Sequence, residues 1–366
     1  MPLTEPAAAP KFHRLRVADL RRETADTVSL SFAVPPALAG AYRFAPGQYL
    51  TLRATIAGEE LRRSYSICTV PEDGELRIAV RRVDGGRFST WVNEALRPGD
   101  PVDVMTPTGR FGAAALAEPA GLHVAFCAGS GITPVLPVAR AVLAASPASR
   151  FHFFYGNRTG ADALFRAELA ALKDRHLGRV SVLHVLSREE QDLPVLNGRL
   201  DGARVRRLLP AMVPPAEIAH AHVCGPATMI DEVAGVLAEF GLPPARLHTE
   251  RFVSAEGGRP RPRPQPPVAP GAPSAHRAAI ILDGKRREVP VAEGETILDA
   301  ALRAGLDMPF ACKGGMCSTC RARLADGEAD MAVNYALEPW ETAAGFILTC
   351  QSRPLTPRVT VDFDAL

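Results

Sequence analysis

Four cysteines lie close together near the C-terminal end of the chain, and their spacing restricts how that part can fold. They follow the pattern Cys312-x4-Cys317-x2-Cys320, and Cys350 comes after 29 further residues. Three thiolates within nine residues can reach one bound group only if the backbone wraps around that group. The two consecutive glycines inside the loop supply conformations that residues with a Cβ atom avoid. The sequence therefore predicts a loop that wraps around a bound group, with backbone N–H groups able to donate to the sulfur atoms.

The bound group that this spacing favours is a two-iron cluster. A Cys-x4-Cys-x2-Cys run followed by a distant cysteine is the spacing of plant-type [2Fe–2S] proteins. The fourth cysteine ends an apolar run, GFILTC, that is typical of a strand. Structural zinc is the alternative, but zinc modules usually pair two short Cys-x2–4-Cys knuckles, whereas one ligand stands alone here. The expected cluster ligands are Cys312, Cys317, Cys320 and Cys350.

Composition and charge exclude several other classes of protein. Hydrophobic residues make up 47% and charged residues 22% of the 366 residues, which is ordinary globular usage. The 42 basic and 40 acidic residues leave a net charge of +2, which does not provide the net basic field expected for binding nucleic acid. Seven cysteines are too few for a disulfide scaffold. A nucleic acid is therefore not expected as a partner.

No segment of the sequence is typical of a secretory signal or a membrane span. The N-terminal residues MPLTEPAAAPKFHRL lack a basic region followed by an apolar run. The most apolar stretch, 121–145, is interrupted by glycine, proline and arginine. We therefore expect a cytoplasmic protein with no membrane partner, in which clustered cysteines are more often metal ligands or redox groups than disulfides. Cys68 and Cys127 lie on apolar strands without ligand spacing, so they are expected in the core.

Three folded domains and one linker are expected. In residues 1–115, short β segments alternate with turn signals, which predicts an antiparallel β-barrel or sandwich. In residues 116–255, mostly apolar strands alternate with helices, which predicts a doubly wound α/β domain. Residues 256–275 contain seven prolines and predict a polyproline-like linker, and residues 276–366 form the cysteine-containing domain. The expected strands are 13–20, 27–32, 48–56, 62–68, 76–83, 100–105, 123–128, 151–156, 180–187 and 221–225, and the expected helices are 134–145, 162–173 and 227–240.

The C-terminal domain resembles plant-type ferredoxins of the β-grasp fold. The resemblance rests on the cysteine spacing and on Leu-Thr-Cys at 348–350. The segment GETILDAALRAGLDMPFAC is similar to the helix that this family places before its cluster loop. The resemblance implies a domain that carries single electrons.

Two segments of the first domain are similar to flavin-binding motifs of the ferredoxin–NADP reductase family. Arg63-Ser64-Tyr65-Ser66 matches its Arg-x-Tyr-Ser/Thr motif, which implies that Tyr65 stacks on a flavin, Arg63 neutralises its pyrophosphate and Ser66 bonds near the flavin N5. GGRFSTWV at 85–92 is similar to the family's Gly-rich turn, where a helix N-terminus favours phosphate. Such a pyrophosphate site favours FAD over FMN, and an ordinary capped glycine turn is the alternative. Its expected contacts are Gly86, Ser89 and Thr90.

Two segments of the second domain are similar to nucleotide-binding segments of the same family. GSGITP at 129–134 follows a strand and precedes a helix; its proline departs from the Gly-x-Gly-x-x-Gly fingerprint but matches the family's Gly-Thr/Ser-Gly-Ile-x-Pro turn. Ser-Arg at 187–188 ends a later strand, where the family holds the 2′-phosphate of NADP, and this favours NADPH over NADH. A chance glycine turn and a surface Arg–Glu face are the alternatives. The expected contacts are Gly129, Ser130, Gly131, Ile132, Thr133, Pro134, Ser187 and Arg188.

Two more segments match positions that lie near the flavin in that family. CGP at 224–226 matches the place where nicotinamide approaches the flavin, although a free cysteine is otherwise most often a small buried hydrophobe. ERF at 250–252 matches the terminal Glu-x-aromatic, in which the aromatic ring covers the flavin; here the chain continues into the linker. The resemblance implies catalytic roles for Ser66, Cys224 and Glu250, and cofactor contacts for Cys224, Gly225, Pro226 and Phe252.

Together these segments predict an electron-transfer chain. NADPH delivers two electrons as a hydride and a [2Fe–2S] cluster accepts one at a time, so a flavin between them resolves the mismatch. The sequence shows neither the iron-binding triad of two histidines and one carboxylate nor paired Glu-x-x-His motifs for activating oxygen. The final acceptor is therefore expected to be another protein. A non-catalytic subunit fed by a partner dehydrogenase is the alternative, against which the nucleotide-binding segments argue.

The order of the domains resembles the reductase components of multicomponent oxygenases. CKGGMCSTCRA at 312–322, MAVNYALEP at 331–339 and LTCQSRPLTP at 348–357 are most similar to the reductase subunits of phenylacetyl-CoA ring epoxidases. The resemblance implies electron flow from NADPH through FAD and the [2Fe–2S] cluster to a di-iron oxygenase component in phenylacetate degradation. The reductase of another aromatic-ring oxygenase or hydroxylase is the alternative.

Overall fold

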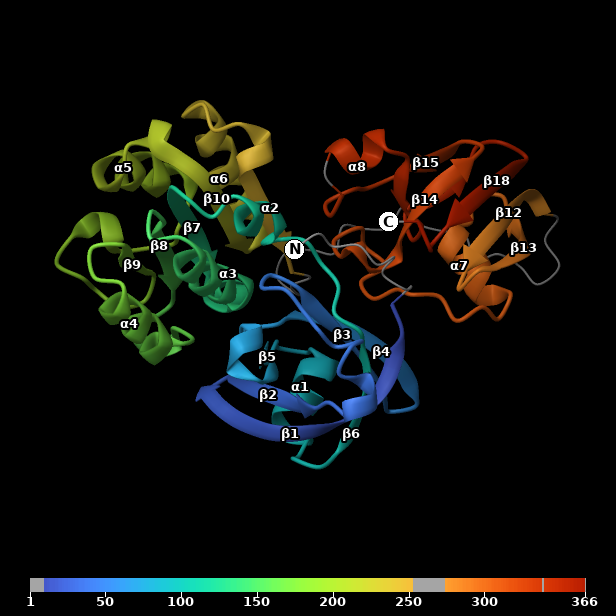
Figure 1. Cartoon of the computed structure of the whole chain (residues 1–366), viewed down its shortest axis with the longest axis horizontal. Helices are drawn as coiled ribbons and strands as arrows, with labels where there is room; N and C mark the ends of the chain where they lie inside the picture. The colour runs from blue at the N-terminus through green and yellow to red at the C-terminus, as the bar shows by residue number, and fades with distance from the viewer. Residues whose placement is uncertain (1–9, 253–273, 338, 366) are drawn as a thin grey trace. The chain divides into compact units, whose positions relative to one another are not determined.

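The computed structural model describes residues 10–252, 274–337 and 339–365, and Figure 1 shows its helices and strands. The described chain divides into two compact units, one built from residues 13–61 and 65–252 and the other mainly from the residues from 274 onward. The expected linker at 256–275 lies outside the described residues as far as 273. Strand β12 begins at Ser274, so the last two positions of the expected linker, 274 and 275, belong to this strand.

The first domain is an antiparallel barrel, as expected. Six strands run in the order β4-β3-β6-β1-β2-β5, and Ile67, just after β4, pairs with Ile78 of β5, so the sheet closes on itself. Alternate residues of these strands fill one apolar core, to which Phe88 and Val92 of helix α1 also belong. The elements are β1 (Phe12–Thr24), β2 (Thr27–Ala33), β3 (Tyr49–Ile56), β4 (Glu59–Ser66), β5 (Leu76–Arg81), α1 (Arg87–Glu94) and β6 (Pro101–Met105).

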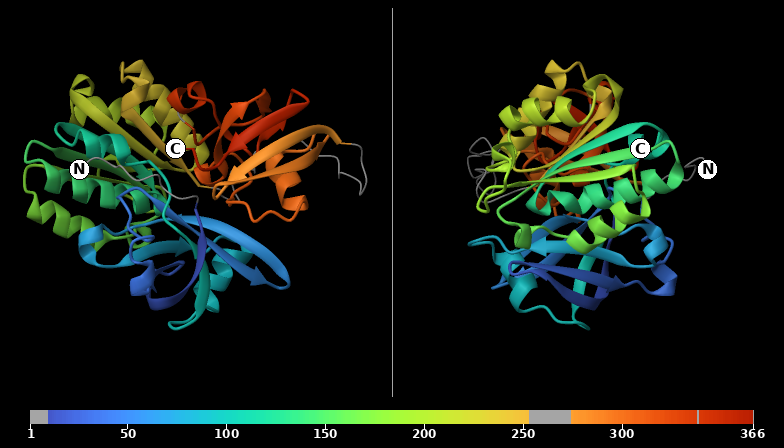
Figure 2. Two further views of the ribbon diagram at one scale, coloured as in Figure 1. Left: turned by 45° about the vertical axis from the view of Figure 1, so that its right-hand side comes forward. Right: turned by 90° about the vertical axis from the view of Figure 1, so that its left-hand side faces the viewer.

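The second domain is a doubly wound parallel sheet with helices on both faces (Figure 2). Its order, β11-β10-β7-β8-β9, places β7 beside β10, and the chain winds outward from this pair in both directions. In such sheets a ligand binds at the carboxyl ends of the strands where the winding direction changes. The elements are α2 (Ala113–Ala117), β7 (Leu122–Ala128), α3 (Ile132–Ala145), β8 (Arg150–Asn157), α4 (Arg166–Arg175), β9 (Val180–Leu186), α5 (Gly202–Met212), β10 (Ile218–Gly225), α6 (Ala227–Glu239) and β11 (Leu247–Arg251).

Several elements of this domain, the short helix α2 among them, differ from the sequence expectation. Helix α4 begins four residues later than expected, because Phe165 adopts a left-handed conformation (φ 56°) directly before it. Helix α5 and strand β11 were not expected. The α5 segment GARVRRLLPAM carries both glycine and proline, which weaken a helix signal. The Asp201 side chain accepts a hydrogen bond from the Arg204 N–H and so caps this helix.

The C-terminal domain has the expected β-grasp arrangement. Strands run in the order β13-β12-β18-β14-β16, with β12 and β18 parallel and the other pairs antiparallel. Helix α7 contributes Ile297, Leu298 and Ala301 to the core of this domain. The elements are β12 (Ser274–Leu282), β13 (Lys285–Ala292), α7 (Ile297–Arg303), β14 (Arg321–Asp326), β15 (Ala329–Met331), α8 (Pro339–Ala343), β16 (Phe346–Leu348), β17 (Ser352–Pro354) and β18 (Arg358–Asp362).

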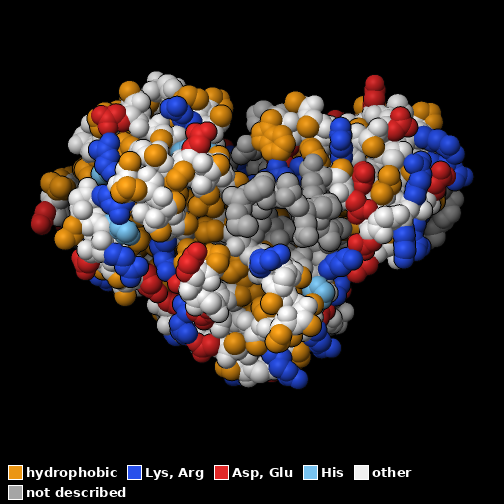
Figure 3. All heavy atoms as spheres, viewed as in Figure 1, with side chains coloured by type: hydrophobic (Ala, Val, Ile, Leu, Met, Phe, Trp, Pro, Cys, Tyr) orange, Lys and Arg blue, Asp and Glu red, His pale blue; other side chains and the backbone are white. Residues whose placement is uncertain are grey.

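Two general features of the described residues are the distribution of surface charge and the lengths of the helices. On the face drawn in Figure 3, basic and acidic side chains are interspersed over each part. Among the helices of the described ranges, none is long and apolar enough to cross a membrane.

A cluster of four histidines is buried near the amino ends of the parallel strands. It consists of His123 on β7, His220 and His222 on β10, and His248 on β11. Neighbouring rings lie 5.2–5.8 Å apart, centroid to centroid, and His222 is fully buried. Burial lowers the pKa of all four imidazoles, to about 4 for His123 and for His248. The folded domain therefore holds these side chains neutral.

We expect the histidine cluster to make the protein acid-labile. Below pH 6.5 the unfolded chain binds protons at these histidines while the folded chain does not, so the free energy of unfolding falls as pH falls. At pH 5.5, His123 and His248 together should lower it by roughly 3 kcal/mol relative to pH 7.5. Urea unfolding at both pH values measures the difference, and His222→Leu should reduce it. Equal stability at the two pH values would contradict this prediction.

Candidate functional site

The Gly-rich turn after β7 lies tightly against the end of β10. The turn occupies Gly129–Gly131, and helix α3 begins at the next residue, Ile132. A Cβ atom on Gly131 would lie 2.0 Å from the Cys224 carbonyl oxygen, so only glycine fits there. Gly129 has a φ of 53°, in the left-handed region that favours glycine. The turn thus brings a helix N-terminus, with its unpaired N–H groups, to the place where the winding direction changes.

Gly131→Ala is expected to destabilise the second domain by about 1–3 kcal/mol or more, because the added methyl group overlaps the β10 backbone. Gly235→Ala on α6 is the matched control, since a Cβ atom there would have no neighbour within 4 Å. This control should instead stabilise the helix by about 0.5–1 kcal/mol. Urea unfolding of the two variants compares these effects, and equal midpoints would contradict the packing described for Gly131.

The remaining residues of that turn also have defined positions. The Thr133 hydroxyl donates to the Ser130 carbonyl oxygen at 2.9 Å, and Pro134 lies in the first turn of α3, where its missing N–H costs nothing. At the end of β10, a Cβ atom on Gly225 would lie 2.7 Å from the Met229 side chain. Pro226 then precedes α6.

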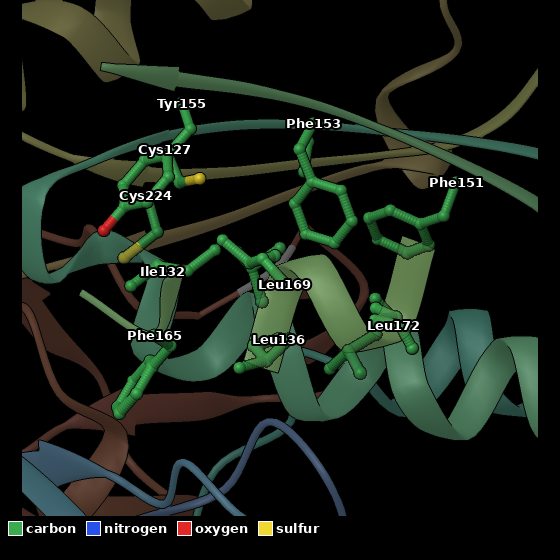
Figure 4. Packing of buried hydrophobic residues seen from close by; sticks show 14 of the residues in the cluster. Cys127, Ile132, Leu136, Phe151, Phe153, Tyr155, Phe165, Leu169, Leu172 and Cys224 are labelled. Carbon is green, nitrogen blue, oxygen red and sulfur yellow. The ribbon is translucent and has the colours of Figure 1, made fainter. Parts of the chain in front are cut away.

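A row of five side-chain positions crosses the sheet at one level near the carboxyl ends of the strands. Strand pairing aligns Glu250, Cys224, Cys127, Tyr155 and His184 from β11 to β9. Figure 4 shows Cys127, Tyr155 and Cys224 together at one end of the apolar packing. Cys224 and Cys127 are fully buried, and burial raises the pKa of both thiols. Both cysteines are therefore thiols rather than thiolates near neutral pH.

Ser66 and Glu250 meet between the two domains of this unit. The Ser66 hydroxyl, at the end of β4, donates to Glu250 Oε2 on β11 at 2.8 Å. Burial raises the pKa of the Glu250 carboxyl to about 7, and the hydrogen bond from Ser66 opposes this rise. Glu250 is also aligned with Cys224 on the neighbouring strand. The barrel and the parallel sheet thus share a carboxyl group that can gain or lose a proton near neutral pH.

The other residues of the barrel motif differ in burial. Arg63 is exposed, and its guanidinium donates to the Arg62 carbonyl oxygen at 2.7 Å. Ser64 is half-buried. The ring of Tyr65 lies 6.1 Å from that of Phe88 on α1 and leaves part of its surface accessible.

The Gly-rich turn before α1 uses its own hydroxyl group to hold its shape. The Ser89 hydroxyl accepts from the Val83 N–H at 3.1 Å and donates to the Gly86 carbonyl oxygen at 3.0 Å. The Thr90 N–H bonds to Gly86 in the first helical turn. The Ser89 hydroxyl and the Thr90 N–H are thus both bonded within the turn, and their contact with a phosphate stays a prediction.

Ser187 and Arg188 follow β9 and are exposed. Backbone bonds fix both residues, because the Ser187 N–H donates to Asn157 and the Arg188 N–H donates to Arg158. The Arg188 side chain is thus available at the carboxyl edge of the sheet. Phe252, just after β11, is partly buried against the apolar cluster that contains Cys224 and Ile132.

An ion-pair network that sequence patterns did not predict joins the barrel to the parallel sheet. Asp26, between β1 and β2, accepts from Arg81 on β5 and from Arg158 after β8, both at 2.9 Å. A Cβ atom on Gly129 would lie 3.0 Å from Arg81 Nη1, so this guanidinium lies against the Gly-rich turn. Burial alone would raise the pKa of Asp26, but the charge and hydrogen bond of Arg81, together with the hydroxyls of Thr24 and Thr27, lower it overall. Isolated charged residues carry no spacing signal, so only the fold brings these three together.

The cysteine loop of the C-terminal domain has the donors that a cluster needs. The N–H groups of Gly314 and Cys317 donate to Cys312 Sγ at 3.3 and 3.4 Å. Gly315 has a φ of 72°, and a Cβ atom there would lie 2.9 Å from the Val333 carbonyl oxygen. Within the described ranges, no three His, Cys, Asp or Glu side chains are arranged to hold a single ion.

The four thiols act on one another's pKa values in two pairs, Cys312 with Cys317 and Cys320 with Cys350. A hydrogen bond from Cys317 lowers the pKa of Cys312, and one from Cys320 lowers the pKa of Cys350. Two pairs of sulfur ligands suit two irons, each of which takes two thiolates in a [2Fe–2S] cluster. Gln351, which the spacing did not single out, is buried and donates to the Lys313 carbonyl oxygen at 2.9 Å and towards Cys350 Sγ at 3.6 Å. It links the loop to the fourth cysteine.

Comparison with protein families gives three matches in the same order as the three domains. Residues 14–112 match the oxidoreductase FAD-binding domain, residues 126–235 the oxidoreductase NAD-binding domain, and residues 280–355 the 2Fe-2S iron-sulfur cluster binding domain. The FAD, NAD and [2Fe–2S] assignments made from sequence are thereby confirmed at the level of domains.

Whole-chain comparisons agree. The chain is 44% identical over 355 residues to a component of the 1,2-phenylacetyl-CoA epoxidase of Escherichia coli K12, covering 97% of this chain and 98% of that one. It is 32% identical over 357 residues to the ferredoxin reductase component of 3-ketosteroid-9-alpha-monooxygenase from Rhodococcus rhodochrous, covering 95% of this chain and 96% of that one. Among solved structures, phthalate dioxygenase reductase matches with a TM-score of 0.57 and 24% identity, covering 96% of this chain and 98% of that one. The similarity to phthalate dioxygenase reductase is evidence for the fold alone.

Proposed function

Because the chain belongs to the family of oxygenase reductase components that join FAD-binding, NAD-binding and [2Fe–2S] domains, we propose that it oxidises NADPH and delivers single electrons to the oxygenase subunits of a phenylacetyl-CoA epoxidase. The observation that carries the proposal is the meeting of Ser66 with Glu250 at 2.8 Å, beside Cys224. It joins the flavin barrel to the carboxyl edge of the nucleotide domain.

Bound FAD supplies chemistry that the chain lacks, since it accepts a hydride from a reduced nicotinamide and releases electrons singly to a cluster that takes one at a time. The chain's own residues bind and orient the flavin and the nicotinamide dinucleotide. Tyr65 offers a ring face, Arg63 a positive charge, and the turn at 129–131 a helix N-terminus for pyrophosphate. Cys224 closes the nicotinamide side as a neutral thiol, and Glu250 holds a proton that Ser66 can share. Cys312, Cys317, Cys320 and Cys350 hold the cluster.

The preference for NADPH over NADH is assigned to Arg188. Its side chain is exposed at the carboxyl end of β9, where a planar guanidinium can bind the 2′-phosphate that NADH lacks. Arg188→Ala should reduce kcat/KM for NADPH by about tenfold to a hundredfold, the value of a charged hydrogen bond, and leave kcat/KM for NADH nearly unchanged. Steady-state kinetics with both nucleotides measure this. An equal loss for both nucleotides would contradict the assignment.

The proposed acceptor rests on the 44% identity to the component of the Escherichia coli epoxidase. Relatives at 32% identity serve a different oxygenase, so the test compares acceptors. The holoprotein is mixed with NADPH and either purified phenylacetyl-CoA epoxidase oxygenase subunits with phenylacetyl-CoA, or a 3-ketosteroid hydroxylase oxygenase with its steroid. Epoxide formation is expected with the first pair and little product with the second. The reverse result would assign the chain to a different oxygenase.

Reduction of the bound groups is tested separately. Under anaerobic conditions, NADPH should bleach the flavin and iron–sulfur absorption bands of the purified holoprotein. Absence of bleaching by either NADPH or NADH would refute the reductase function itself, whereas failure in the acceptor comparison alone would refute only the partner.

A further inference from the structure

The Gln351 side chain lies between the two parts of the sequence that carry the clustered cysteines. It directly follows Cys350 in the turn between β16 and β17 and is 6% exposed. Its amide nitrogen, Nε2, lies 2.9 Å from the Lys313 carbonyl oxygen, 3.0 Å from the Cys350 carbonyl oxygen and 3.6 Å from Cys350 Sγ. One buried amide group therefore contacts both the loop at 312–320 and the fourth cysteine.

Backbone bonds hold Gln351 in this position without using its amide group. The Gln351 N–H donates to the Leu348 carbonyl oxygen at 2.8 Å, and the Gln351 carbonyl oxygen accepts from the Ala332 N–H at 3.0 Å. A Cβ atom on Gly315 would lie 3.3 Å from Gln351 Cγ, so the aliphatic part of the side chain packs against the loop. A side-chain amide has two donor hydrogens. One is directed at the loop, and the other is shared between the carbonyl oxygen and the sulfur of the fourth cysteine.

The bond to the loop acts on a residue with an unusual backbone conformation. Lys313 has a φ of 49°, in the left-handed region, which a residue with a Cβ atom rarely adopts unless its surroundings hold it there. Its carbonyl oxygen is held by Gln351, and its ammonium group bonds to Asp299 Oδ1 on α7 at 2.9 Å. The next residue, Gly314, donates its N–H to Cys312 Sγ at 3.3 Å. Gln351 thus helps to orient a donor toward the first cysteine as well.

Donors directed at the sulfur atoms favour one oxidation state of a bound cluster over the other. An N–H group that donates to a charged acceptor stabilises its negative charge. Reduction of a [2Fe–2S] cluster adds one negative charge, and the reduction potential of such a cluster depends on hydrogen bonds to its sulfurs. The donors that Gln351 provides and orients therefore stabilise the reduced state more than the oxidised state.

We propose that Gln351 is a positioning residue that raises the reduction potential of the [2Fe–2S] cluster, by donating to Cys350 Sγ and by holding the loop that donates to Cys312 Sγ. The step that this favours moves one electron from the reduced flavin to the oxidised cluster and breaks no covalent bond. The inference rests on the proposed function, in which the four clustered cysteines are the cluster ligands.

The test measures the midpoint potential of the cluster in the holoprotein. The protein is titrated anaerobically with dithionite and redox mediators, and the electron paramagnetic resonance signal of the reduced cluster is followed. Gln351→Leu removes the amide donors at similar volume. The ratio of reduced to oxidised cluster at a fixed potential should fall about tenfold, the value of one hydrogen bond, and this corresponds to a midpoint lower by about 59 mV for a one-electron couple. Gln351→Glu, which replaces the donors with a negatively charged acceptor, should lower the midpoint further.

Gln191→Leu is the matched control. The Gln191 side chain lies in the second domain, where its amide nitrogen donates to the carbonyl oxygens of His184 and Leu196. The same substitution there removes an amide from the holoprotein without touching the C-terminal domain. It should leave the midpoint potential of the cluster unchanged.

An unchanged or raised midpoint in both Gln351 variants would overturn the inference, and a lowered melting temperature would then assign Gln351 to the fold alone. If Gln351→Leu does not fold or does not assemble the cluster, Gln351→Glu decides, because glutamate keeps the size and shape of glutamine. Failure of the proposed function gives a different result. In that case Cys350→Ala would retain the iron–sulfur bands, or NADPH would leave the wild-type holoprotein oxidised, and neither result depends on Gln351.

Discussion

Replacing Cys350, a proposed cluster ligand, with alanine is expected to reduce electron delivery to the oxygenase by more than about a hundredfold. Loss of a metal ligand should exceed the tenfold to hundredfold cost of losing a contact that only supports a ligand. Cys350 is buried and paired with Cys320. The variant should lose the iron–sulfur absorption bands and keep those of the flavin. NADPH oxidation with ferricyanide, which takes electrons directly from the flavin, should continue.

The control for this variant is Cys68→Ala. Cys68 is a buried thiol of the first domain, bonded to the Arg77 carbonyl oxygen, and it belongs to neither thiol pair. This variant should retain both sets of bands and electron delivery to the oxygenase. Product formation by the Cys350→Ala variant at the wild-type rate would show that electrons do not pass through this cluster.

Replacing Glu250, the carboxyl group between the barrel and the parallel sheet, should have a second large effect, on the rate of flavin reduction. Glu250→Gln should slow flavin reduction by NADPH about a hundredfold, the lower range for loss of a general acid. A hydride alone would give the anionic reduced flavin, and formation of neutral FADH₂ would take up one further proton, which the protonated Glu250 carboxyl would supply. Since the pKa of Glu250 is raised to about 7, the wild-type rate should fall as pH rises through 7, and this dependence should disappear in Glu250→Gln. Stopped-flow absorbance from about pH 6 to about pH 8.5, a range that brackets this pKa, measures it.

Ser66→Ala provides a sharper version of the same test. The Ser66 hydroxyl lowers the pKa of Glu250 against the effect of burial. Its removal should therefore raise that pKa and move the inflection in rate to higher pH. Glu239→Gln, which removes an exposed carboxylate paired with Arg206, is the control and should leave the profile unchanged. An unshifted inflection in Ser66→Ala would mean that Glu250 is not the titrating group.

Much of the fold could be predicted because its signals are local. The strands of the barrel lie where apolar segments alternate with turns, and β7, β8, β9 and β10 lie on the apolar runs that favoured a parallel sheet. The signal failed at α5, where glycine and proline hide a helix that packing and the Asp201 cap stabilise. It also failed at the start of α4, where Phe165 adopts a conformation that no pattern indicates.

The candidate site divides in the same way. Cysteine spacing and the segments at 63–66, 129–134 and 224–226 could be proposed from the sequence because each of these segments is contiguous in the chain. The bonding of Ser89 within its own turn could not be recognised, because a sequence motif does not show which donor groups are already engaged. The link from Asp26 to Arg81 and Arg158 has no spacing signal at all.

The sequence alone determined the four clustered cysteines, the order of three domains and the residue types at each cofactor loop, since these depend on neighbours along the chain. Only the tertiary structure decided which distant groups meet. Closure of the barrel beside the sheet puts the Ser66 hydroxyl on Glu250, and the placing of β10 beside β7 puts Gly131 against the Cys224 backbone. The same packing buries four neutral histidines. The shifted pKa values of these buried groups arise from burial, which is a property of the packed fold.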